Sequence, residues 1–176
     1  MKKISLFFVV VLCAIVCFSN SSNAQTINKL YTGLNLGISS FTSGGGDSPT
    51  DVHLGLESSY RLNYNYALVA TAAATWDVNA TFWEVTVNGR YYFQPESEYK
   101  FFGEAGLGAY TLKAEVFGIV LESKTYAGIN LGGGVSKGFF SDKLIVNLKV
   151  KYHNPFTTGG VKANWVNTTI GLSVPL

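Results

Sequence analysis

The sequence predicts an all-β fold: an eight-stranded antiparallel up-and-down transmembrane β-barrel, preceded by a cleavable signal peptide. Three observations predict it. Apolar residues alternate with small or polar residues in eight separate segments. Charged residues make up only 14% of the 176 residues, well below the roughly 25% of soluble domains. Aromatic residues, also 14%, gather near the ends of the alternating segments. We expect residues 1–24 to form the signal peptide and residues 25–176 to form one barrel domain.

The first 24 residues have the three parts of a secretory signal peptide. Two lysines open the segment, residues 4–18 form an apolar run, and Ser22-Asn23-Ala24 is a small-x-small cleavage signature before Gln25. The alternative, an uncleaved membrane anchor, is disfavoured because a run of about 15 apolar residues is short for a spanning helix.

Cleavage of the signal peptide would remove both cysteines and the two lysines that give the chain its net charge. Cys13 follows Leu12 and Cys17 follows Val16, whereas a lipidated cysteine needs a small residue before it. We therefore expect the exported part to contain no thiol, no disulfide and no cysteine-based metal site. Without the two lysines at positions 2 and 3, the 13 basic residues become 11 and balance the 11 acidic ones. No nucleic-acid partner is expected from such a balance.

The first four expected strands cover residues 30–39, 52–62, 66–77 and 83–93. Side chains of a strand point alternately to its two faces, and each of these segments has one apolar and one small or polar face. The apolar faces carry Leu30, Leu34, Leu36 and Ile38; Val52, Leu54, Leu56, Tyr60 and Leu62; Tyr66, Leu68 and Trp76; and Trp83, Val85, Val87, Tyr91 and Phe93. The opposite faces carry Tyr31, Asn35 and Ser39; His53, Glu57 and Arg61; Thr71, Thr75 and Asp77; and Glu84, Asn88 and Arg90.

The last four expected strands cover residues 101–111, 127–136, 144–153 and 166–176. Their apolar faces carry Phe101, Ala105 and Leu107; Ala127, Ile129, Leu131 and Val135; Leu144, Val146, Leu148 and Val150; and Val166, Ile170, Leu172 and Val174. The opposite faces carry Phe102, Glu104 and Tyr110; Asn130 and Ser136; Asn147, Lys149, Lys151 and His153; and Asn167 and Ser173. Strands of about 9 to 12 residues have the length that a tilted strand needs to cross a bilayer.

Alternation alone also fits a soluble barrel of the lipocalin kind, in which the apolar face points inward. The position of the charges favours the membrane. The charges on the expected strands share the face of Gly, Asn, Ser and Thr, with Lys137, near a strand end, as the exception: Glu57, Arg61, Asp77, Glu84, Arg90, Glu104, Lys149 and Lys151. A Lys or Arg facing lipid at the bilayer centre would cost roughly 2 to 4 kcal/mol. We therefore expect the polar face to line a narrow lumen.

Aromatic residues and connection lengths also favour a membrane barrel. One expected rim holds Tyr60, Tyr64, Tyr66, Tyr91, Phe93, Tyr99, Phe101, Phe139 and Phe140, and the other holds Phe41, Trp76, Trp83, Tyr152, Phe156 and Trp165. Two aromatic bands are typical of the two membrane interfaces. The connections at 63–65 and 140–143 are tight, 94–100 is intermediate, and 41–51, 111–124 and 154–164 are long. This alternation is typical of outer-membrane barrels, which have short periplasmic turns and long outer loops. The short connection at 78–80 departs from it.

The sequence resembles the small eight-stranded outer-membrane barrels of the OmpA/OmpX type. Two alternating Gly-rich segments carry the resemblance, residues 101–110 (FFGEAGLGAY) and 127–135 (AGINLGGGV), together with the alternating strand at the end of the chain. It implies location in the outer membrane of a Gram-negative bacterium. The chain ends Val174-Pro175-Leu176, whereas such proteins usually end in Phe, and we expect no peptidoglycan-binding domain after the barrel.

We expect no catalytic residue, no metal site, no cofactor and no enzymatic activity. The glycine runs at 44–46 and 132–134 lack the Gly-Lys-Ser/Thr of a phosphate-binding loop. His53 and His153 fall on the polar face near the expected outer rim. The surroundings of His153 faintly resemble those of the catalytic histidine in lipid A deacylases, but the position of their serine nucleophile is Pro155 here. A two-histidine metal site is disfavoured because the second and seventh strands are not neighbours.

The lumen charges have a structural explanation, because charges buried in so narrow a barrel must pair. If the turn after the fourth strand centres on Ser97, paired residues sum to 194, which sets Arg90 opposite Glu104. Both would point inward, and we expect removal of one partner to destabilise more than removal of both. A narrow path for ions or water is the alternative to a packed plug.

Three classes of function follow from the sequence. The first is a non-enzymatic outer-membrane barrel with an envelope-structural or surface-interaction role through its extracellular loops. The second is a narrow channel for ions or small apolar solutes, and the third is a lipid A-modifying enzyme. The expected partners are outer-membrane lipids, lipopolysaccharide and the barrel-assembly machinery during insertion, and we expect a monomer.

Overall fold

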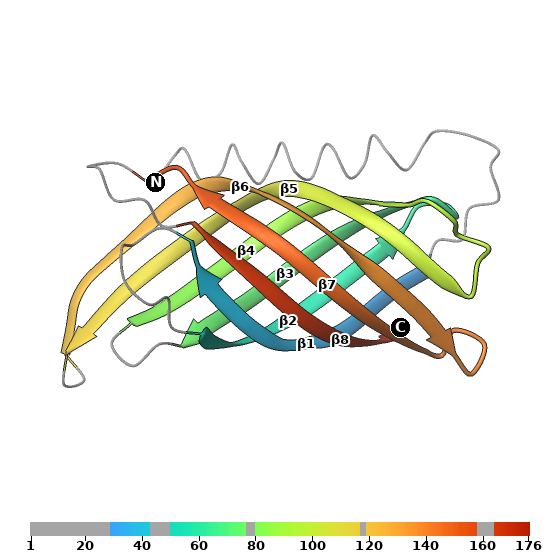
Figure 1. Ribbon diagram of the computed structural model, residues 1–176, viewed down its shortest axis with the longest axis horizontal. Helices are drawn as coiled ribbons and strands as arrows, with labels where there is room; N and C mark the ends of the chain where they lie inside the picture. The colour runs from blue at the N-terminus through green and yellow to red at the C-terminus, as the bar shows by residue number, and fades with distance from the viewer. Residues whose placement is uncertain (1–28, 43–49, 77–79, 117–118, 158–163) are drawn as a thin grey trace.

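The computed structural model describes residues 29–42, 50–76, 80–116, 119–157 and 164–176, which form a closed eight-stranded barrel (Figure 1). The strands are β1 (Lys29–Phe41), β2 (Thr50–Arg61), β3 (Tyr66–Trp76), β4 (Ala80–Tyr92), β5 (Tyr99–Val116), β6 (Ile119–Phe139), β7 (Leu144–Pro155) and β8 (Trp165–Pro175). Each strand pairs antiparallel with the next, and β8 pairs with β1. The predicted up-and-down barrel is confirmed. The expected signal peptide lies outside the described residues, which contain no helix long and apolar enough to span a membrane.

One circuit of the strand pairing defines the stagger of the barrel. Following paired residues from Lys29 across all eight strands returns to β1 at Ser39, ten residues further along (29 to 39). The circuit passes through Arg61, Ala67, Arg90, Glu104, Gly132, Lys151 and Asn167. This stagger tilts the strands, as Figure 1 shows. Eight tilted strands enclose an interior just wide enough for side chains.

The two faces of the barrel have opposite chemistry. Apolar side chains point outward, and Leu36, Leu131 and Ile170 are 57–64% exposed. Polar and charged side chains point inward, and Glu57 and Lys149 are buried. A soluble lipocalin-like barrel would have the reverse arrangement, so the apolar outer surface is the one that contacts lipid. Asp77, expected on the inner face, lies outside the described residues.

We call the end of the barrel where β1 begins and β8 ends the terminal end, and the opposite one the far end. Short turns join β2 to β3 and β6 to β7 at the terminal end. The Asn63 side chain accepts hydrogen bonds from the backbone amides of Asn65 (2.9 Å) and Tyr66 (2.8 Å), which is an Asx turn. Phe140, Ser141 and Asp142 have φ of 54°, 58° and 62°, a left-handed run that is uncommon without glycine.

The β5–β6 hairpin is longer than the sequence predicted. We expected a loop over 111–124, but the two strands continue to Val116 and Ile119 and project at the far end (Figure 1). The register shifts between Ala114 and Glu115, which interrupts the alternation that the prediction relied on. The long connections expected at 41–51 and 154–164 lie partly outside the described residues, as does the Gly44-Gly45-Gly46 run.

The two aromatic bands are present with two errors, Phe41 and Trp165. Phe41 shares the odd-numbered, inward face of β1 with Ser39, and its ring lies 4.6 Å from Phe82 and 5.9 Å from Trp165, measured between centroids. Exposed rings occur at both ends of the barrel, including Tyr66, Phe93 and Phe101 at the terminal end and Trp76 and Trp83 at the far end. Trp165 does not belong to the outer band, because it is only 2% exposed. Its odd number places it on the inward face of β8 with Asn167, and it packs inside the far end of the lumen.

Candidate functional site

Five buried charges form a chain of ion pairs across the lumen. Arg90 Nη2 lies 2.9 Å from Glu57 Oε1 and 2.6 Å from Glu104 Oε2. Lys149 Nζ lies 2.6 Å from Glu57 Oε2, and Lys151 Nζ lies 3.0 Å from Glu104 Oε1. The order is therefore Lys149, Glu57, Arg90, Glu104, Lys151, in which opposite charges alternate. We call these five residues the ion-pair chain.

The strand register explains part of the ion-pair chain. Arg90 of β4 pairs directly with Glu104 of β5, as the sequence predicted, and the Arg90 Nε donates a 2.8 Å hydrogen bond to that carboxylate. Glu57 of β2 and Lys149 of β7 belong to strands that pair with neither β4 nor β5. They join the chain because the lumen is narrow enough for side chains to meet across it. Isolated burial of any of these charges would cost several kcal/mol.

A second buried cluster surrounds His153 near the far end. The imidazole stacks on Trp165, with ring centroids 5.1 Å apart and planes 9° apart, and meets Tyr110 edge-on at 5.6 Å. His153 Nδ1 lies 3.2 Å from the Tyr110 hydroxyl and 3.5 Å from Glu84 Oε2. Its Nε2 lies 3.2 Å from the Asn167 amide. The side chain is fully buried and has partners on both ring nitrogens.

His53 is connected to the His153 cluster through small polar side chains. His53 Nδ1 lies 3.0 Å from Thr75 Oγ1, which lies 3.1 Å from Ser39 Oγ. Ser39 Oγ donates a 2.6 Å hydrogen bond to Asn167 Oδ1. Both histidines therefore lie on the inner face, as the sequence predicted. Their side chains are buried in the lumen, away from solvent. The sequence did not predict their link, because it runs between strands far apart in the chain.

Each of the two histidines lies beside a hydroxyl group. The hydroxyls beside the histidines belong to Thr75 and Tyr110, and both are buried with the rings. A nucleophile must reach its substrate, and neither hydroxyl faces a surface. In the described part of the chain, no three His, Asp, Glu or Cys side chains gather in a metal-binding group.

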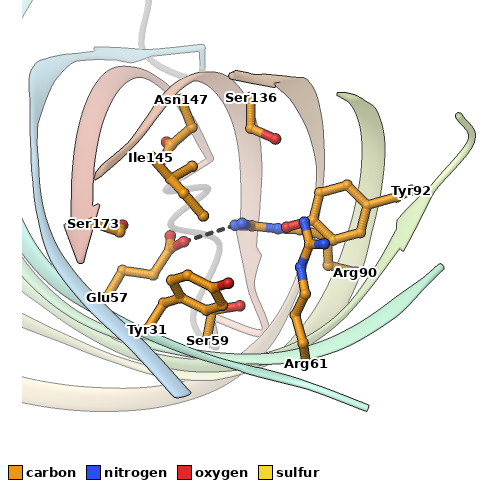
Figure 2. Close-up of a pocket in the computed structure, with 10 residues that line it drawn as sticks. All are labelled: Tyr31, Glu57, Ser59, Arg61, Arg90, Tyr92, Ser136, Ile145, Asn147 and Ser173. Atoms are coloured by element: carbon orange, nitrogen blue, oxygen red, sulfur yellow. Dashed lines mark hydrogen bonds and ion pairs between the residues drawn. The ribbon is translucent and has the colours of Figure 1, made fainter. Parts of the chain in front are cut away.

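A small cavity lies at the terminal end of the lumen, lined in part by Glu57 and Arg90 of the ion-pair chain (Figure 2). Its volume for the centres of water-sized molecules is about 20 Å³, room for about one water. It is lined by Tyr31, Glu57, Ser59, Arg61, Arg90, Tyr92, Ser136, Ile145, Asn147 and Ser173. Arg61 lies with its guanidinium carbon 4.3 Å from the centroid of the Tyr92 ring. We call this space the terminal cavity.

A closed barrel with an apolar outer surface, aromatic bands and a charged, filled lumen is a small integral protein of the bacterial outer membrane. The comparison with protein families agrees: the chain belongs to the outer membrane protein beta-barrel domain family, whose model matches residues 9–174. Its location is therefore the outer membrane of Gram-negative bacteria. No match was found among curated protein sequences.

Several solved structures share this fold at low sequence identity. Neisserial surface protein A is 16% identical with a TM-score of 0.72, and the match covers 82% of this chain and 96% of that one. The attachment invasion locus protein Ail of Yersinia pestis is 14% identical with a TM-score of 0.57, covering 84% and 97%. The outer membrane enzyme PagL is 14% identical with a TM-score of 0.52, covering 83% and 99%. The fold thus occurs in surface proteins and in an enzyme.

Proposed function

We propose that this protein is a non-enzymatic outer-membrane barrel that acts in envelope structure or surface interaction through the connections at its far end. The observation that supports this most is the ion-pair chain, in which each buried charge of the lumen lies beside a charge of opposite sign. A lumen filled in this way is a rigid support for loops and has little space for a solute. The fold is also that of Ail, an attachment protein by name.

The orientation in the membrane follows from the connections. At the terminal end every connection is short, at 62–65, 93–98 and 140–143, and short turns are periplasmic in barrels of this class. The far end, with the connections around 43–49 and 158–163 and the projecting β5–β6 hairpin, would then face outward. Lipopolysaccharide is the lipid expected around that end, and barrel-assembly machinery is the partner expected during insertion.

Replacement of the far-end connections tests the proposal. Residues 43–49 and 158–163 would be exchanged for Gly-Ser segments of equal length in a complemented deletion strain. We expect the variant to remain in outer-membrane fractions but to lose whatever binding or envelope-integrity phenotype the wild type restores. A matched variant in the terminal-end turn, Ser141→Gly, should restore it fully. Equal restoration by the loop variant would contradict a role for these connections.

Two further measurements separate the other classes of function. A channel would give steady conductance when the refolded protein is added to a planar bilayer, whereas a filled lumen should give none above background. A lipid A-modifying enzyme, the third class expected from the sequence, would change the lipid A mass spectrum on expression. We expect no change, because the His153 side chain is fully buried. Either positive result would overturn the proposal.

A further inference from the structure

The terminal cavity contains a buried cation whose charge no carboxylate of the described chain balances. Arg61 is 7% exposed, yet none of the ion pairs among the described residues includes it. The other buried cations, Arg90, Lys149 and Lys151, each lie within 3.0 Å of a glutamate. We propose that the terminal cavity binds a small inorganic anion of the chloride class, held by the Arg61 guanidinium.

The charges around the terminal cavity favour an anion over a cation. Arg61 and Arg90 line it against the single carboxylate of Glu57, which leaves a net charge of +1. Both oxygens of Glu57 are already occupied, one by Arg90 at 2.9 Å and the other by Lys149 at 2.6 Å. Asp142, in the turn at the same end, pairs with Lys100 at 3.5 Å. The uncompensated charge at this position is therefore that of Arg61.

The remaining lining residues supply hydrogen-bond donors without charge. Figure 2 shows Arg61 and Tyr92 side by side on one side of the cavity, with Tyr31 and Ser59 near them and Ser136 and Asn147 on other walls. A hydroxyl or an amide donates to an anion, and a guanidinium gives the stronger charge-assisted bond. Buried charges in proteins are normally paired. An anion beside Arg61 would supply the pairing that the described chain lacks.

The size of the terminal cavity selects the class of anion. A volume of about 20 Å³ for water-sized centres accepts about one water molecule, so a monatomic ion fits whereas tetrahedral phosphate or sulfate does not. A water molecule would also fit, but it carries no charge and would leave Arg61 uncompensated. This difference makes the proposal testable.

Titration with chloride at constant ionic strength tests the site directly. The refolded barrel in uncharged detergent micelles would be titrated with sodium chloride against sodium gluconate, whose anion is too large for the cavity. We expect excess chloride NMR line width that saturates, and a melting temperature that rises with chloride but not with gluconate. Wild-type protein that shows neither effect would hold water only, and the proposal would be wrong.

Two variants assign the effect to Arg61. Arg61→Gln should weaken chloride binding about tenfold or more, the loss expected from a charge-assisted hydrogen bond, while Arg61→Lys should retain most of it. Lys29→Gln is the matched control, because Lys29 is the residue paired with Arg61 in β1 but is exposed on the surface. Equal binding by Arg61→Gln, or equal loss in Lys29→Gln, would place the anion elsewhere.

A measurement on the wild type covers the case in which Arg61→Gln does not fold. Crystals grown in sodium bromide should show an anomalous difference peak within hydrogen-bond distance of the Arg61 guanidinium. A peak confined to the outer surface would mean an adventitious ion only. Folding of every variant would be checked by its β-sheet circular dichroism before titration.

Discussion

At the scale of single residues, Glu104 and Arg90 differ in what their removal would leave behind in the ion-pair chain. Glu104 contacts both Arg90 and Lys151, so its removal strands Lys151 and leaves Arg90 to share Glu57 with Lys149. Removal of Arg90 leaves two complete pairs, Lys149 with Glu57 and Lys151 with Glu104. The same kind of substitution should therefore have different costs at the two positions.

We expect Glu104→Leu to lower the free energy of unfolding by about 3 to 5 kcal/mol, the usual cost of stranding a buried charge. Arg90→Leu should cost less, and the double variant should be more stable than Glu104→Leu alone because Arg90 and Lys149 no longer share the single carboxylate of Glu57. Urea unfolding of the protein refolded into lipid vesicles measures all three. This revises the expectation from sequence that either single change is worse than the double one.

An exposed ion pair provides the control for that cycle. Lys137 lies 2.6 Å from Glu98 at the terminal end, and Glu98 is 69% exposed. Surface pairs contribute little to stability, so Glu98→Leu should leave the unfolding curve almost unchanged. Additive effects of Glu104→Leu and Arg90→Leu would mean that the two side chains do not interact, and would contradict the β4–β5 register.

The sequence could predict one link of the ion-pair chain and not the others, for a physical reason. Arg90 and Glu104 face each other on neighbouring strands, and the position of one turn determines such a pairing. Glu57 reaches both Arg90 and Lys149 across the lumen, and these contacts depend on the stagger of the whole barrel. Arg61 was predicted to face inward. That it has no carboxylate partner among the described residues could be recognised only once all the contacts in the lumen were known.

At the scale of single strands, glycine controls how closely two strands and their side chains approach. Gly106 of β5 pairs with Asn88 of β4. A Cβ atom at position 106 would collide with the Val87 carbonyl oxygen and with the Asn88 side chain. Gly89, one residue along β4, has no atom within 4 Å of its Cβ position and lies on the exposed face.

Gly106→Ala should therefore lower the free energy of unfolding by about 1 to 3 kcal/mol, the usual cost of overpacking. Gly89→Ala should change it by less than about 0.5 kcal/mol, as at an uncrowded surface position. Both variants are measured by the same urea titration. Equal stability of the two variants would show that the wall between β4 and β5 has more room than the structure allows.

Strand ends were less predictable than strand centres. The centres of all eight strands follow the alternation in the sequence, because lipid on one side and a polar lumen on the other impose it residue by residue. The β5–β6 hairpin extends beyond its neighbours, where that constraint no longer applies to both faces. Phe41 and Trp165 were misplaced for a related reason, since an aromatic residue near a rim suits either the membrane interface or the interior of the lumen.

At the scale of the whole molecule, export and orientation are both open to measurement. We expect cleavage after Ala24, which gives an exported chain that begins at Gln25 and lacks Cys13 and Cys17. Mass spectrometry of the protein extracted from outer membranes should find this N-terminus. Recovery of a chain that still contains either cysteine would contradict the prediction.

The outward apolar face and the inward polar face should also differ in their access to lipid. Spin labels introduced on the outer face should collide often with oxygen, which dissolves in the bilayer, and labels on the inner face should not. The outer positions are Leu36, Leu54, Val87, Leu131, Val146 and Ile170, and the inner positions are Asn35, Asn88 and Asn130. The inner set avoids the ion-pair chain, so that labelling does not strand a charge, and Asn35, Asn88 and Asn130 are at most 4% exposed.

Because neighbouring residues of a strand face opposite sides, Leu36 beside Asn35 and Val87 beside Asn88 are internal controls at almost the same depth. Equal oxygen access at such a pair would mean that the strand does not separate lipid from lumen there, and the reverse order would place the apolar face inside.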